Sequence, residues 1–105
     1  MAAVQRACDI IKQHYDSLHS LLADPNVVSK LIFRLHYNEL ITYSDQCLLD
    51  DCAGRGSSHQ ATALLTIVMN SVTIDDNYFE KFVRVLKEDP VLCPTAVHLL
   101  KSYSM

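Results

Sequence analysis

The sequence predicts an all-α fold, a bundle of six short and largely antiparallel helices in a single domain spanning residues 1–105. Apolar residues recur at helical spacing over six stretches, and no stretch alternates apolar and polar side chains over the length of a strand. Half of the residues are hydrophobic, and only two glycines and three prolines interrupt the chain. These proportions favour a true core and short connections between neighbouring helices.

The first helix is predicted over residues 4–22. Its apolar stripe shifts between Ile11 and Leu18, which allows for a bend in the middle. The second helix is predicted over residues 27–37. An Asp-Pro pair, Asp24-Pro25, precedes it, and this pair supplies a cap followed by a residue suited to the first helical turn.

The third helix is predicted over residues 43–52, with Thr42 or Ser44 as its cap. The triplet Gly-Arg-Gly at 54–56 is the clearest break in the sequence. The fourth helix follows this break, with Ser57 or the next serine as its cap, and extends to about residue 71.

The fifth helix, over residues 75–89, is the most amphipathic, with Asp75 or Asp76 as its cap and Pro90 beyond its end. A sixth helix begins at Pro94 or the residue after it. The predicted core consists of residues on the apolar faces of the second to fifth helices: Leu31, Leu35, Leu48, Leu64, Leu65, Val68, Phe79, Phe82, Val83 and Leu86.

Composition argues against several classes of function. A formal charge of −3 argues against binding to nucleic acid, and no apolar run is long enough to cross a membrane. The N-terminus lacks the pattern of a secretory signal, so we expect a cytoplasmic protein with four reduced cysteines. The cysteines and histidines form no tight ligand pairs and no catalytic signature. We therefore expect no metal, no cofactor and no enzymatic activity.

Charged residues separate by sign between the predicted helices. The acidic residues are Asp45, Asp50 and Asp51 of the third helix and Glu39 in the connection before it, and the basic residues near the first and fourth helices are Arg6, Lys12 and Arg55. A second basic stripe on the fifth helix consists of Lys81, Arg84 and Lys87. Opposed patches on one small domain permit head-to-tail association, which propagates into a filament when it does not close.

Three segments together resemble a known family. The first is Leu40-Ile41-Thr42 between the second helix and an acidic third helix that bears Asp45. The others are the paired leucines within residues 60–68 and the aromatic and Phe-Val residues within 78–86. Their arrangement over nearly the whole chain resembles the caspase recruitment domain (CARD) of the death-fold superfamily.

The resemblance implies a non-catalytic module that binds other CARDs, in an adaptor, caspase, kinase or sensor, or a second copy of itself. Such modules act in apoptotic or innate-immune signalling. Carried over by position, the acidic surface would be Asp45, Asp50 and Asp51, and the basic surface would be Arg6, Lys12 and Arg55.

The chain departs from the family at the start of the fourth helix. Many members carry Arg or Lys before the paired leucines, where this chain has Ala61, Thr62 and Ala63. The basic surface is therefore thin, and the second basic stripe is an alternative. A death domain or pyrin domain is also an alternative, as is a helical scaffold without homotypic pairing, and an enzyme dependent on cysteine or a metal ranks well below these.

Overall fold

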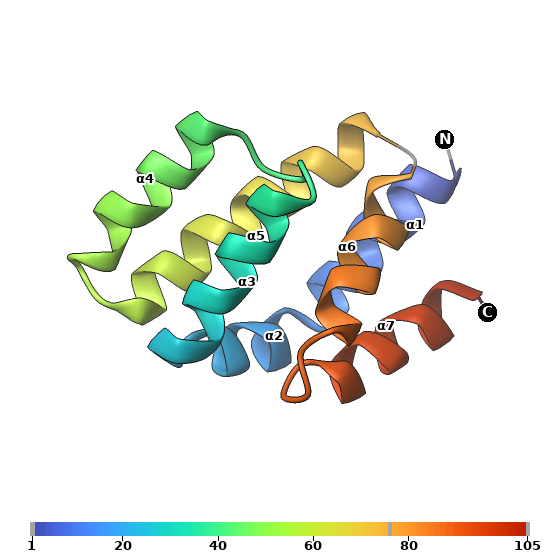
Figure 1. Cartoon of the computed structure of the whole chain (residues 1–105). Coiled ribbons are helices and arrows are strands. Elements are labelled where there is room, and N and C mark those ends of the chain that lie inside the picture. Colours follow the sequence, from blue (N-terminus) through green and yellow to red (C-terminus); the bar gives the residue numbers. More distant parts are fainter. Residues whose placement is uncertain (1, 76, 105) are drawn as a thin grey trace.

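The computed structural model describes residues 2–75 and 77–104, with side chains from residues 7 to 75 and 77 to 103. Within these ranges every regular element is a helix: α1 (Ala2–Gln13), α2 (Tyr15–Leu22), α3 (Pro25–Tyr37), α4 (Tyr43–Ala53), α5 (Ser57–Ile74), α6 (Tyr78–Lys87) and α7 (Cys93–Ser104). Each helix contacts the next one in sequence, and α4 runs opposite to both α3 and α5 (Figure 1). The prediction of an all-helical chain is confirmed.

The described chain forms seven helices rather than the predicted six, because the predicted first helix is divided into α1 and α2. The backbone leaves helical geometry at His14, where φ is −101° and ψ is 12°. This change of direction lets α1 pack against α5 and α7 while α2 packs against α3 and α5. Ile11 and Leu18, between which the apolar stripe shifts, lie on opposite sides of the break and are both fully buried.

Two of the predicted helix caps are present. The Asp24 carboxylate accepts a hydrogen bond from the backbone N–H of Asn26 at 2.9 Å, and Pro25 occupies the first turn of α3. At α4, the Thr42 hydroxyl accepts from the N–H of Asp45, and the Asp45 carboxylate accepts from the N–H of Thr42, both at 3.0 Å. This reciprocal pair is a capping box, which ties α4 to the turn that precedes it.

The start of α5 differs from the prediction. Neither Ser57 nor Ser58 is the cap, because Gly56 occupies that position and Ser57 is the first helical residue. Gly56 has a φ of +115°, a conformation that residues with a Cβ rarely adopt. The Ser57 hydroxyl instead donates a hydrogen bond to the carbonyl of Ala23, so it links the start of α5 to the end of α2.

The boundary between α5 and α6 also differs. The long helix α5 extends to Ile74, beyond its predicted end, and Asp75 terminates it. The Asp75 carboxylate accepts from the N–H of Asn77 at 2.9 Å, and α6 begins only at Tyr78. The other predicted cap, Asp76, lies outside the described residues.

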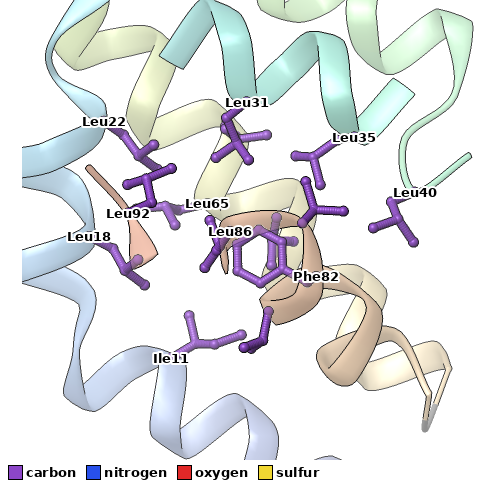
Figure 2. Close-up of a cluster of buried hydrophobic side chains, with 14 of the residues drawn as sticks. Ile11, Leu18, Leu22, Leu31, Leu35, Leu40, Leu65, Phe82, Leu86 and Leu92 are labelled. Atoms are coloured by element: carbon purple, nitrogen blue, oxygen red, sulfur yellow. The ribbon is translucent and has the colours of Figure 1, made fainter. Parts of the chain in front are cut away.

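The core forms around α5 and α6. The central helix α5 contacts α1, α2, α3, α4 and α6. Figure 2 shows Phe82 and Leu86 of α6 surrounded by side chains from several helices, including Ile11, Leu18 and Leu65. The predicted core residues that are fully or almost fully buried are Leu31, Leu35, Leu64, Leu65, Val68, Phe79, Phe82, Val83 and Leu86.

The assignment of Leu48 to the core is wrong, because its side chain is 52% exposed. Successive helical residues are rotated by about 100° around the axis, so Leu48 and Leu49 do not both face α5. Leu49 takes the inward position and is fully buried. The side-chain amide of Gln60 donates to the Leu49 carbonyl at 3.0 Å, which fixes this orientation of α4 against α5.

Candidate interaction surfaces

The outward half of α4 is acidic. This helix contains Asp45, Asp50 and Asp51 and no Lys or Arg. Asp50 and Asp51 are exposed, whereas Asp45 is half-buried and its carboxylate is engaged in the capping box. Two of the four predicted acidic residues therefore present unengaged carboxylates on this helix.

Large apolar side chains accompany these carboxylates. Tyr43 is 73% exposed and Leu48 is 52% exposed, and with Asp50 and Asp51 they form what we call the α4 patch. A side-chain hydrogen bond with Cys47 raises the pKa of Tyr43 above its ordinary value, and the nearby Asp50 adds to this effect. Exposed apolar groups beside charges are a frequent composition of protein-binding surfaces.

The predicted basic surface does not come together. The side chain of Arg6 lies outside the described residues, and Lys12 is exposed at the end of α1. Arg55 lies in the turn between α4 and α5, which is on the opposite side of the molecule from α1 in Figure 1. There it lines a hollow together with Leu48 and Asp51. The position of Arg55 thus places it beside the acidic residues, not with Lys12.

The second basic stripe lies along α6, where Lys81, Arg84 and Lys87 are all exposed. Carboxylates interrupt it, because Glu80 lines one hollow with Arg84 and Lys87, and Glu88 lines another with Lys81 and Arg84.

Glu39 belongs to the surroundings of this stripe. The residues on either side of it, Asn38 and Leu40, line the same hollow as Lys81 and Arg84. Glu39 itself is exposed and has a φ of +61°, which is uncommon for a residue with a side chain. The turn that contains Glu39 thus borders the basic stripe of α6.

A fourth surface, on α3, was not predicted. Lys30, Phe33 and Tyr37 are exposed on the side of α3 away from its buried residues, and the half-buried Arg34 lies next to them; we call these four residues the α3 patch. Phe33 is 66% exposed and Tyr37 is 79% exposed. The spacing i, i+3, i+4, i+7 of these four residues was a detectable signal, but helical spacing alone does not tell which apolar face is buried.

The cysteines and histidines form no evident site. Cys8, Cys47, Cys52 and Cys93 are free thiols. His19 Nε2 lies 2.9 Å from the Thr62 hydroxyl, which makes it a link between α2 and α5. Among the side chains that the structure describes, no three of the types His, Cys, Asp and Glu gather as metal ligands would.

Comparisons with protein-family models, with curated proteins and with solved structures give no match. In the described part of the chain, no helix combines the length and apolar character needed to cross a bilayer.

Proposed function

We propose that this chain is a non-catalytic protein–protein interaction module of the CARD type, which pairs with other CARDs or with itself in cytosolic apoptotic or innate-immune signalling. In this proposal α1 and α2 are the two parts of a bent first helix, and the seven helices correspond to a six-helix bundle of the death-fold type. Repeated pairing would build a filament or helical oligomer.

The α4 patch is the observation that carries this proposal. An exposed leucine and an exposed tyrosine lie on the same helix as two unengaged carboxylates. Apolar side chains of this size gain free energy when a partner covers them, at about 25 cal/mol per Å² of apolar surface. The helix thus offers both an apolar contact and a charge that selects its partner.

The carboxylates of Asp50 and Asp51 give the contact its specificity. Lys or Arg side chains on a partner would be attracted to them, and a partner with an acidic surface would be repelled. Because these carboxylates are exposed, salt screens their attraction. Binding through the α4 patch should therefore weaken as salt is added.

The proposal is tested by a pull-down of the domain against a panel of CARDs, death domains and pyrin domains. We expect retention by one or more CARDs and loss of that retention in the double variant Asp50→Lys/Asp51→Lys. The double variant Asp16→Lys/Glu80→Lys is the matched control, because it changes the net charge equally at exposed positions of α2 and α6.

Circular dichroism of both variants establishes that the helices are intact. Retention only by a death domain or a pyrin domain would assign the chain to that sister class. Equal loss in both variants would mean that net charge, not the α4 patch, governs binding. Absence of binding to every member of the panel and to the domain itself would contradict the proposed function.

A further inference from the structure

We propose that the surface that receives the α4 patch is the α3 patch of a second copy of this chain, and not the predicted basic surface on the first and fourth helices. This inference rests on the proposed function, because it names the partner surface for the same α4 patch. Four residues carry it: Lys30, Phe33, Arg34 and Tyr37.

The charges of the two helices are complementary. Helix α3 contains Lys30 and Arg34 and no Asp or Glu, and α4 contains three Asp and no Lys or Arg. The copies therefore attract each other when α4 of one faces α3 of the other, whereas α3 facing α3 or α4 facing α4 is repulsive. Charge thus selects one pairing of the two helices.

The α3 patch also has the apolar anchors that an interface needs. Aromatic residues and Arg are enriched at the centres of interfaces and contribute most of their binding energy. Phe33 and Tyr37 present two aromatic rings to solvent one helical turn apart, with Lys30 and Arg34 beside them. On the opposing copy, Tyr43 and Leu48 are apolar counterparts for these rings.

A hollow beside Arg34 favours α3 further. Arg34 is half-buried, and its Nη1 is enclosed by the chain itself. A bond from Arg to a carboxylate is among the stronger hydrogen bonds in proteins. Arg34 lines a hollow with Lys30 and Phe33, so a carboxylate that enters there would meet both cations.

The other basic surfaces fit less well. Along α6 the cations alternate with Glu80 and Glu88, and the hollows there contain no exposed large apolar residue. Arg55 lines its hollow together with Asp51, an acidic residue of its own chain. The α3 patch alone among these surfaces combines two cations with exposed aromatic rings and lacks a carboxylate on the same helix.

The test uses two complementary variants of the whole chain in sedimentation-velocity experiments. Lys30→Glu/Arg34→Glu reverses the charge of the α3 patch, and Asp50→Lys/Asp51→Lys reverses the charge of the α4 patch. We expect the parent chain to self-associate and each variant alone to be monomeric. An equimolar mixture should associate again, because the first variant keeps a native α4 patch and the second keeps a native α3 patch.

Phe33→Ala gives a second measurement that changes no charge. We expect it to weaken self-association by at least about tenfold, as truncation of an interface anchor does. Its circular dichroism should match the parent, because the Phe33 ring is exposed and contributes little to the core.

Several outcomes would overturn the inference. These are a monomeric parent chain, a mixture that stays monomeric, or self-association that survives Lys30→Glu/Arg34→Glu but is lost in Lys81→Glu/Arg84→Glu on α6. One outcome would separate the two proposals: Lys30→Glu/Arg34→Glu self-associates like the parent, while Asp50→Lys/Asp51→Lys still loses its CARD partner. In that case the proposed function stands, and only the assignment of the α3 patch as the receiving surface fails.

Discussion

Tyr78 provides the sharpest test of how the helices are held together. Its ring is 6% exposed at the start of α6, and its hydroxyl donates a hydrogen bond to the carbonyl of Leu40 at 2.7 Å. This bond joins α6 to the connection between α3 and α4. Removing the hydroxyl with Tyr78→Phe leaves the ring in place and leaves a buried carbonyl without its donor. We expect a loss of roughly 1–3 kcal/mol in the free energy of unfolding at neutral pH.

The same hydroxyl makes stability depend on alkaline pH. Burial raises the pKa of Tyr78 from 10.0 to about 12; the charge of Asp45 also raises it and a hydrogen bond with Ser71 lowers it. Below pH 10 both folded and unfolded chains keep the proton, so Tyr78 contributes its full stability there. Between pH 10 and 12 the unfolded chain releases the proton first, and stability falls. Each pKa unit corresponds to about 1.4 kcal/mol, so this fall amounts to roughly 2–3 kcal/mol.

Urea unfolding followed by circular dichroism, at neutral pH and at steps up to pH 12, measures both effects. Tyr78→Phe should be less stable than the parent at neutral pH and should lose less stability as the pH rises. Tyr37→Phe in dilute solution is the control, because Tyr37 is exposed and should leave both values unchanged. A variant with the parent's stability at neutral pH, or with the same alkaline fall, would refute the assigned role of the Tyr78 hydroxyl.

Two further pairs of substitutions test the packing of α4 and the turn after it. Leu49→Ala should lower the free energy of unfolding by about 2–5 kcal/mol, as is usual for a buried leucine, whereas Leu48→Ala should change it by less than about 0.5 kcal/mol; equal effects in chemical denaturation would contradict the observed orientation of α4. Gly56→Ala should cost about 1–3 kcal/mol because of the positive φ. Gly54→Ala should leave the free energy of unfolding nearly unchanged, since an added Cβ meets only an ordinary contact at 3.5 Å. If thermal unfolding shows a larger loss of stability for Gly54→Ala than for Gly56→Ala, the role of the Gly56 conformation is refuted.

The candidate surfaces were predictable only in part. The charged residues of α6 are exposed, as are Asp50 and Asp51 of α4, which is usual for polar positions of amphipathic helices. Which charges lie together depends on distant parts of the chain. Arg55 lines a hollow with Asp51, and the turn that contains Glu39 borders the basic stripe of α6. The exposure of Phe33 and Leu48 could not be predicted from the sequence either, because both are apolar residues within helices.

The sequence by itself determined the helical class, most of the helix boundaries, the cap at Asp24 and nearly all of the predicted core, and it gave Thr42 as one of two candidate caps for α4. These features depend on local spacing and local hydrogen bonds, which a single stretch of chain contains.

Only the tertiary structure decided the break at His14, the choice of Leu49 over Leu48 and the grouping of the charged surfaces. Each of these depends on where other helices lie: α1 and α2 pack against different neighbours, and α5 accepts only one of the two leucines. A side chain is buried only if a neighbouring helix covers it, and residue spacing along one helix does not specify that neighbour.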